Sequence, residues 1–291
     1  MTGFSKSVTM TSVACIRFVH IYGDYFMIKL VATDVDGTLV KDSYPEVYPE
    51  MIEMIKKLRA MDIIVCIASG RQYSSIARMF KDVADDLIFI AGNGSHIKCR
   101  GVDMSIVKMD RGYAEELTRD LRAHKDECEL IFEAPGLTYV ESKDEEFIHI
   151  LKNLYRNDTI LVDDALEANQ NIVKISAFHR PSIRKLGEEV LIPKWKDRLK
   201  ATMAGEDWVD FMDKSVDKGN ALKTIQDFFH ITPEETMVFG DNNNDIGMLD
   251  IAAESYAVET APDVVKAHAA HICGSWKEKG VYQVLKEKFG E

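Results

Sequence analysis

The chain has 291 residues, of which 46% are hydrophobic and 29% charged, and its formal net charge is −12. This composition is typical of a globular protein with a sizeable core and excludes a disordered or fibrous chain. Acidic residues outnumber basic ones, and the sequence has no basic region of the kind that binds nucleic acid. No apolar stretch reaches the roughly 18 to 20 residues of a membrane span. We therefore expect neither nucleic acid nor a membrane as a partner.

Five scattered cysteines form no C-x-x-C pair. Their odd number and spacing favour a reduced compartment, so we expect a cytoplasmic protein. The first 26 residues precede a second methionine, Met27, at the first convincing strand. Thr and Ser dilute the apolar character of this segment and no cleavage site is clear, so we interpret residues 1–26 as an N-terminal extension.

From Ile28 onward, short apolar segments alternate with segments of helical periodicity. Near-continuous apolar strands separated by helices predict a parallel sheet that is covered on both faces. A hairpin that turns at Arg100-Gly101 follows. The expected strands are 28–34, 62–69 and 86–92, the expected helices are 46–61 and 72–83, and the hairpin covers 95–108.

A different order of elements begins near Asp110, where helices are followed by paired strands. This order predicts an antiparallel sheet with helices on one side, an α+β unit. The expected helices are 112–126, 145–157 and one from Pro181, and the expected strands are 128–134, 137–141, 159–164, 171–179, 198–204 and 207–212.

The alternation of strand and helix returns at Asp217. The simplest interpretation is one α/β core, residues 27–109 and 213–291, interrupted by an inserted α+β domain, residues 110–212. The remaining expected elements are helices 218–230, 245–253, 262–268 and 281–289 and strands 236–240 and 255–258.

Four polar motifs of the core follow apolar segments. Ligands bind in an open parallel sheet at the carboxyl ends of its strands, so these motifs are expected to meet at one edge. Lys218 begins a helix instead, but that helix starts at the same edge. The motifs are DVDGT (34–38), ASGR (68–71), DKGNAL (217–222) and GDNNND (240–245).

Three aspartates in these motifs, Asp34, Asp36 and Asp241, are hard oxygen donors without Cys or His beside them, as Mg²⁺ prefers. A carboxylate can also attack phosphorus, and Asp34, at the strand end, is the candidate nucleophile. Asp36 is the candidate general acid and base. Lys218 would supply positive charge for the transferring phosphoryl group, which an acidic protein otherwise lacks.

Backbone N–H groups near Gly37, and the hydroxyl and turn of Ser69 and Gly70, are suited to bind phosphate. Arg71 either closes on the substrate or pairs with an acid. His96, His179 and Trp208 are favoured for packing or surface positions rather than for substrate contact.

The four motifs, in this order, resemble those of the haloacid dehalogenase (HAD) superfamily. The insert between the second and third motifs resembles the C2B cap of its Cof-like, subfamily IIB members, whose "NG" after the third strand corresponds to Asn93-Gly94. The resemblance covers nearly everything from Met27 to the C-terminus. The family commonly has Thr where Ser69 stands, and small apolar residues where Ser95-His96 stand here.

This resemblance implies a Rossmann-like core and a Mg²⁺-dependent phosphatase. It implies that Asp34 is nucleophile and metal ligand, that Asp36 is acid, base and metal ligand through its backbone carbonyl, and that Asp241 is the third metal ligand. The expected phosphate-binding residues are Ser69, Gly70, Lys218 and Asn244, and the expected supporting residues are Gly37, Thr38, Arg71, Asn93 and Asp245.

The predicted function is hydrolysis of a small phosphorylated metabolite through an aspartyl-phosphate, with a sugar phosphate favoured. The sequence separates this poorly from a phosphotransferase of the phosphomannomutase type, because the acceptor is selected by the cap. A third alternative is a receiver-like signalling module with a phosphorylated aspartate. A candidate base at Asp36 and a cap of about a hundred residues oppose that alternative, and the sequence leaves the oligomeric state open.

Overall fold

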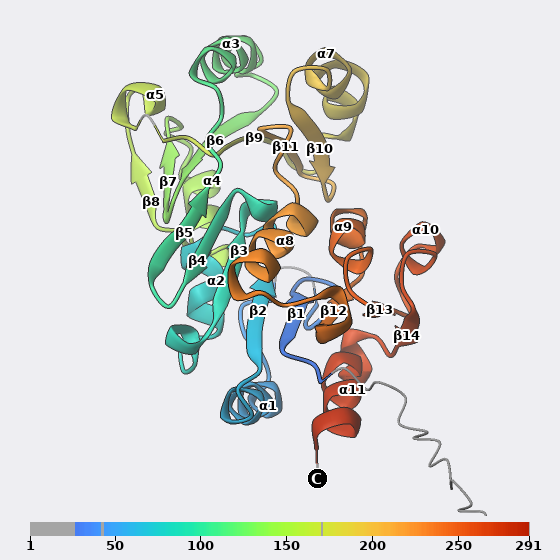
Figure 1. Ribbon diagram of the computed structural model, residues 1–291. Coiled ribbons are helices and arrows are strands. Elements are labelled where there is room, and N and C mark those ends of the chain that lie inside the picture. Colours follow the sequence, from blue (N-terminus) through green and yellow to red (C-terminus); the bar gives the residue numbers. More distant parts are fainter. Residues whose placement is uncertain (1–26, 42–43, 170, 291) are drawn as a thin grey trace, which may run out of the picture.

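A computed structural model describes residues 27–41, 44–169 and 171–290 of the chain. Within them the chain forms two β-sheets, and helices pack on both (Figure 1). The predicted N-terminal extension, residues 1–26, lies outside the described residues. The predicted α/β fold with a second, α+β unit is confirmed.

The larger sheet has eight strands in the order β14-β13-β12-β1-β2-β3-β4-β5. The first six in this order are parallel, and the hairpin adds β4 and β5 antiparallel at one edge. All five residues of β1 are buried, because layers cover both faces. The strands are β1 (Leu30–Asp34), β2 (Ile64–Ala68), β3 (Ile88–Ala91), β4 (His96–Cys99), β5 (Val102–Ile106), β12 (Thr236–Gly240), β13 (Glu254–Val258) and β14 (His271–Cys273).

The helices around this sheet pack against it through apolar side chains. Helix α1 (Pro49–Ala60) has proline in its first turn, where the missing N–H costs nothing, and it contacts α11 (Gly280–Phe289). Helix α8 (Lys218–Phe229) packs against α9 (Ile246–Leu249). The remaining elements are α2 (Tyr73–Met79), α10 (Asp263–Lys266) and the 3-10 turns η1 (Ala84–Asp86), η2 (Gly92–Gly94), η5 (Pro233–Glu235), η6 (Asn243–Asp245) and η7 (Trp276–Glu278).

Between β5 and α8 the chain forms the segment Arg111–Met212, which we call the inserted unit. Its sheet has the order β10-β11-β9-β6-β7-β8. Figure 1 shows it beyond the end of the larger sheet at which α8 begins. Its strands are β6 (Glu129–Ala134), β7 (Leu137–Val140), β8 (Thr159–Leu161), β9 (Lys174–Phe178), β10 (Lys200–Ala204) and β11 (Trp208–Met212), and its helices are α3 (Arg111–Arg122), α4 (Glu145–His149), the π-helical η3 (Ile150–Leu154), α5 (Ala165–Ala168), α6 (Arg184–Leu186), the π-helical η4 (Gly187–Leu191) and α7 (Ile192–Trp195).

Two expectations for this sheet are wrong. Strands β7 and β8 are parallel, because α4 and η3 carry the chain back to the starting end of β7. Helices also lie on both faces of the sheet. Phe132 packs in the same core as Leu117 of α3, whereas its neighbour Ile131 points to the other face and packs with Phe147 of α4.

Several predicted helices are shorter or interrupted. The helix expected at 145–157 continues from α4 into a π-helical turn, and the one expected from Pro181 consists of α6, η4 and α7. The helix expected at 245–253 is the short α9 after a 3-10 turn. Strand β14 was not predicted, because it has three residues and two of them are exposed.

The face of the inserted unit that carries α4 and η3 contacts the larger sheet's helix α2 and the loop before it. The hydroxyl of Ser75 donates a hydrogen bond to the backbone carbonyl of Tyr155 at 2.7 Å. The ammonium of Lys174 lies 3.4 Å from the carbonyl oxygen of Gly70. These contacts position the inserted unit over the carboxyl ends of β1 and β2.

Candidate active site

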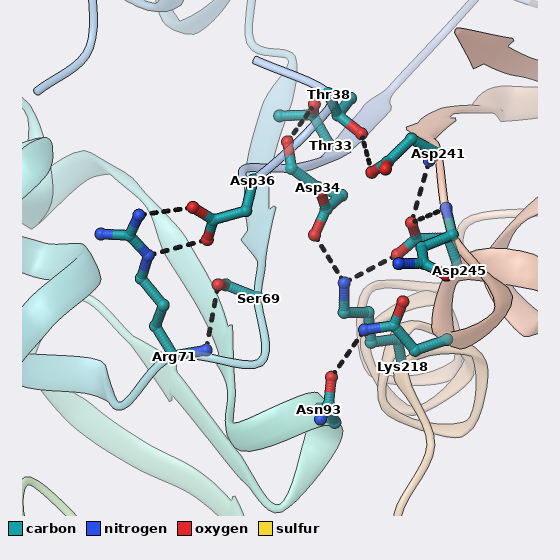
Figure 2. Close-up of polar contacts among 12 residues, drawn as sticks. Thr33, Asp34, Asp36, Thr38, Ser69, Arg71, Asn93, Lys218, Asp241 and Asp245 are labelled. Atoms are coloured by element: carbon teal, nitrogen blue, oxygen red, sulfur yellow. Dashed lines mark hydrogen bonds and ion pairs between the residues drawn. The ribbon is translucent and has the colours of Figure 1, made fainter. Parts of the chain in front are cut away.

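Asp34 is the last residue of β1, and its carboxylate is buried at the centre of the site (Figure 2). Its Oδ1 accepts a hydrogen bond from Lys218 Nζ at 2.6 Å. Its Oδ2 is buried and has no hydrogen-bond partner among the residues that the structure describes. Burial raises the pKa of Asp34 well above its usual value, and the nearby Asp245 and Asp241 add to this, although Lys218 opposes it. Such an oxygen needs a cation or a reacting group.

Lys218 is the first residue of α8, whose N-terminus is capped by the side chain of Asp217. Its ammonium lies between Asp34 and Asp245, at 2.6 and 2.7 Å from their Oδ1 atoms. Burial alone would lower the pKa of Lys218, but the two carboxylates outweigh it and raise the pKa, so the side chain stays charged. The lysine supplies fixed positive charge behind Asp34.

The acidic loop after β12 is held by Asp245. Its Oδ2 accepts hydrogen bonds from the backbone N–H groups of Asp241 and Asn242, both at 3.0 Å. The Asp241 carboxylate accepts a hydrogen bond from the hydroxyl of Thr38 at 2.8 Å. Burial and the neighbouring Asp245 raise the pKa of Asp241 to about 6. The loop therefore presents Asp241 beside Asp34.

Gly37 permits this approach of the two motifs. Its φ is +86°, a conformation that side chains disfavour, and a Cβ there would lie 2.4 Å from Asp241 Oδ2. Any other residue at this position would therefore be strained and would displace the Asp241 carboxylate.

Asp36 points away from Asp34 and toward Arg71 (Figure 2). Its Oδ2 accepts a hydrogen bond from Arg71 Nε at 2.7 Å, and its Oδ1 accepts another from Arg71 Nη2. Arg71 also donates to the carbonyl of Tyr44. Of the two roles that the sequence left open for Arg71, this structure has the pairing with an acid.

The opposite wall of the site consists of Ser69, Gly70 and the loop at Asn93. The hydroxyl of Ser69 accepts a hydrogen bond from the N–H of Arg71 at 3.1 Å, and Asn93 N–H donates to the Ser69 carbonyl at 3.0 Å. Asn93 has the left-handed φ of +58° and accepts a hydrogen bond from the amide of Asn244 at 2.8 Å. The second and fourth motifs thus meet through Asn93.

The acidic residues fit a divalent cation. Carboxylate oxygens of Asp34, Asp241 and Asp245 lie within 4.8 Å of one another. The Asp245 oxygens are already engaged with Lys218 and with backbone N–H groups, so Asp34 and Asp241 have the greater capacity to bind. The unpartnered Asp34 Oδ2 and the all-oxygen donor set suit Mg²⁺. The Asp36 side chain is directed to Arg71 and not to these oxygens.

These residues border a cavity of about 450 Å³ between the larger sheet and the inserted unit. Gly37, Thr38, Lys218 and Asp245 lie behind its wall, with Lys218 1% exposed. The expected site residues that line it are Asp34, Asp36, Ser69, Gly70, Arg71, Asn93, Asp241 and Asn244.

Sequence reasoning missed the side of this cavity that the inserted unit supplies. Glu133, Lys174 and Asp210 line it, and each is the single charged residue within a largely apolar stretch, in IFEA, IVKISAF and WVDFM. A single charged residue in an otherwise apolar strand was the sequence feature that could have indicated these residues. Trp208 lines the cavity too, whereas His96 is buried against Asp103 and His179 is exposed.

The sequence profile of the haloacid dehalogenase-like hydrolases matches residues 31–285. The 5-amino-6-(5-phospho-D-ribitylamino)uracil phosphatase YbjI of Escherichia coli is 27% identical over 262 residues, covering 89% of this chain and 95% of that protein. A crystal structure of a protein from Eubacterium rectale is 35% identical, with a TM-score of 0.82, covering 90% of this chain and 99% of that one.

A third match is the sugar phosphatase BT4131 of HAD subclass IIB, which is 23% identical with a TM-score of 0.74 and covers 89% of this chain and 98% of that one. It shares the fold, and the profile match confirms the predicted haloacid dehalogenase family. No helix within the described residues is long and apolar enough to cross a membrane. The chain therefore belongs to the haloacid dehalogenase-like hydrolase family and, like its curated relatives, is a phosphatase, a hydrolase of phosphoric monoesters.

Proposed function

We propose that this phosphatase hydrolyses a small phosphorylated metabolite with the aid of Mg²⁺, through an aspartyl-phosphate on Asp34. One observation carries the proposal: the buried, unpartnered Oδ2 of Asp34 lies at the base of a cavity that Ser69, Asn93 and Asn244 also line. A carboxylate with one oxygen fixed by Lys218 and the other unengaged is prepared either to bind a cation or to attack phosphorus.

In the first step a carboxylate oxygen of Asp34 attacks phosphorus and the bond to the leaving oxygen breaks. Asp36, starting as the acid, gives its proton to that oxygen. Lys218 stabilises the charge on and around Asp34, and Ser69 with Asn244 binds the phosphoryl oxygens. The product is an aspartyl-phosphate and a free alcohol.

In the second step Asp36, now a carboxylate, takes a proton from a water molecule as that water attacks phosphorus. The bond from phosphorus to Asp34 breaks, inorganic phosphate forms and the nucleophile is restored. Mg²⁺, held by Asp34, Asp241 and the backbone carbonyl of Asp36, would supply positive charge against the acidic site and the phosphate.

We further propose that residues 110–212 act as a cap on a core formed by residues 27–109 and 213–291. The contacts from Ser75 to Tyr155 and from Lys174 to Gly70 support this, since they hold the inserted unit over the site. A closed cap would exclude bulk water and select the leaving group.

The preferred substrate in this proposal is a sugar phosphate or a phosphorylated polyol. The matched relatives support it by name, one as a phosphatase of a phosphoribityl compound and another as a sugar phosphatase. We also propose a cytoplasmic location, which the free, buried Cys66, Cys128 and Cys273 favour.

The test is release of inorganic phosphate from a panel of phosphorylated metabolites, with and without Mg²⁺, followed by acid quenching of the Asp36→Asn variant. We expect this variant to accumulate phosphate covalently bound to protein, whereas Asp34→Asn should accumulate none. Turnover without any phosphoprotein in either variant would disprove the covalent route. Transfer of phosphate to a sugar hydroxyl instead of water would indicate the phosphotransferase alternative.

A further inference from the structure

Four polar side chains of the inserted unit form one buried network opposite Asp34. We call Glu133, Lys174, Ser176 and Asp210 the roof network. Lys174 Nζ lies 3.1 Å from Glu133 Oε1 and 3.2 Å from Asp210 Oδ2, and the Ser176 hydroxyl donates to Asp210 Oδ1 at 2.6 Å. All four line the cavity, and each is more than nine-tenths buried.

The N–H and O–H donors of the roof network are all engaged, whereas its carboxylates can accept further hydrogen bonds. The ammonium of Lys174 has three N–H groups, and they face Glu133, Asp210 and the carbonyl of Gly70. The Ser176 hydroxyl is also committed to Asp210. Each carboxylate offers about four lone-pair sites, of which these contacts occupy one or two. The groups with remaining capacity are therefore hydrogen-bond acceptors, which recognise a ligand's O–H or N–H groups.

The charge of this side of the cavity disfavours a second anion. The charged residues that line it from the inserted unit are Lys174 and four acids, Glu133, Glu206, Asp207 and Asp210. Glu206 and Asp207 are paired with Arg184 and Arg180, so the repulsion comes mainly from Glu133 and Asp210, two carboxylates that share one ammonium. A second phosphate would bring about −1.5 to −2 charge near these acids and away from Lys218. A neutral hydroxylated group avoids this repulsion and can donate to the carboxylates.

An apolar wall lies beside the roof network. Ile131, Leu151, Tyr155 and Trp208 line the same cavity, and the Trp208 indole is held by a hydrogen bond to the Tyr155 hydroxyl at 3.1 Å. Aromatic and aliphatic surfaces of this kind suit the C–H face of a sugar or polyol chain, whose other face carries hydroxyls.

From these observations we infer that Glu133 and Asp210 are specificity residues, which accept hydrogen bonds from hydroxyls of the leaving group and select an uncharged, hydroxyl-rich monophosphate against a bisphosphate. The inference rests on the proposed function, because it assumes that a phosphate is cleaved at Asp34. Lys174 positions the two carboxylates and joins them to the turn at Gly70.

The test compares matched substrates, each pair differing only in a second phosphate. The pairs are fructose 6-phosphate with fructose 1,6-bisphosphate, glucose 6-phosphate with glucose 1,6-bisphosphate, and ribose 5-phosphate with ribose 1,5-bisphosphate. 4-Nitrophenyl phosphate, whose leaving group has no aliphatic hydroxyl, reports the phosphoryl chemistry alone. For the wild-type enzyme we expect at least one monophosphate to exceed its bisphosphate at least tenfold in kcat/KM.

The Glu133→Gln and Asp210→Asn variants keep the shape of each side chain and remove its charge. Hydrogen bonds to charged groups are strong enough that losing one should lower kcat/KM for the preferred monophosphate about tenfold to a hundredfold, relative to 4-nitrophenyl phosphate. Discrimination against the bisphosphate should weaken in the same variants. The matched control is Glu129→Gln, on the same strand but outside the cavity lining, which should leave these ratios at wild-type values.

The outcomes separate this inference from the proposed function. If the wild-type enzyme releases phosphate from none of the probes, the proposed function fails. If it cleaves 4-nitrophenyl phosphate but none of the sugar monophosphates, or cleaves both members of every pair equally, only the inference is overturned. Equal losses on every substrate in Glu133→Gln and Asp210→Asn would indicate a purely structural network and would also overturn it.

Discussion

Arg71 holds Asp36 by two hydrogen bonds, from Nε and Nη2 to the two carboxylate oxygens, and thereby turns it away from Asp34. The two aspartates of the first motif are thus separated by their partners. Lys218 binds Asp34 and Arg71 binds Asp36, so each acid of the pair has its own cation.

The Arg71→Met variant should therefore lose activity through misplacement of Asp36. General acid-base catalysis is worth about 10² to 10⁴ in rate, and a freely rotating Asp36 would forfeit part of it, so we expect kcat to fall about tenfold to a hundredfold. Steady-state kinetics should show the loss mainly in kcat. If KM rises and kcat is unchanged, Arg71 binds substrate rather than positioning Asp36. The control is Arg59→Met, an arginine of α1 far from the cavity lining.

The Asp34→Asn variant should be inactive yet folded. Loss of a nucleophile typically lowers kcat by more than about a thousandfold. The thermal midpoint should not fall, because the substitution removes a buried carboxylate whose pKa burial raises and leaves Lys218 paired with Asp245. Phosphate release and thermal unfolding of the same preparation check both parts. Retained turnover would refute the assignment of Asp34.

The four motifs were predictable because each is a local polar signal after an apolar strand, and topology alone brings strand ends together. The convergence of Asp34, Lys218 and Asp241 needed only a parallel sheet. What the sequence could not give is the direction of a side chain. Asp36 lies two residues after Asp34, yet Arg71 draws it to the other side of the site.

The inserted unit was harder to predict, because its contribution depends on tertiary contacts. Glu133, Lys174 and Asp210 come from three strands, and nothing in their spacing says that they share one face of a sheet. The parallel pairing of β7 and β8 likewise depends on where α4 and η3 return the chain. Short elements such as β14 carry too few residues for a periodic signal.

The contribution of Asp241 to stability should depend on pH in the direction opposite to that of a salt-bridged acid. The pKa of Asp241 is raised to about 6 in the folded protein from an unfolded value near 3.8, so this carboxyl binds more protons in the folded state between these values. Carboxyls whose pKa is lowered, such as Asp103 and Asp120, act in the opposite direction in wild type and variant alike. In EDTA the thermal midpoint of the wild type should therefore fall relative to that of Asp241→Asn as the pH rises from about 4 to about 6. A midpoint that rises through this window, and does so equally in wild type and variant, would contradict the buried state of Asp241.

Mg²⁺ should counteract this loss, because it binds the ionised carboxylates and only in the folded state. At a concentration about a hundredfold above its Kd, binding of one ion should raise the thermal midpoint by about 5 °C. The increase should be larger at neutral pH than below the pKa of Asp241, and absent from Asp241→Asn. Differential scanning calorimetry in EDTA and in millimolar Mg²⁺ measures it. An equal increase in the variant would place the ion elsewhere.

Lys218 should contribute to stability as well as to chemistry, because its side chain is fully buried between two carboxylates. Removing one partner of a buried ionic group leaves unpaired charge, which typically costs about 3 to 5 kcal/mol, so Lys218→Met should lower the free energy of unfolding by that amount. Combining Lys218→Met with Asp34→Asn removes one of the two carboxylates left without a cation and should restore part of the lost free energy of unfolding. Lys223→Met, on the same helix but paired with Asp227 at the surface, is the control and should have little effect. Urea unfolding of the wild type, Lys218→Met, the double variant and Lys223→Met measures these differences. A Lys218→Met variant as stable as Lys223→Met would show that the buried carboxylates do not need the lysine.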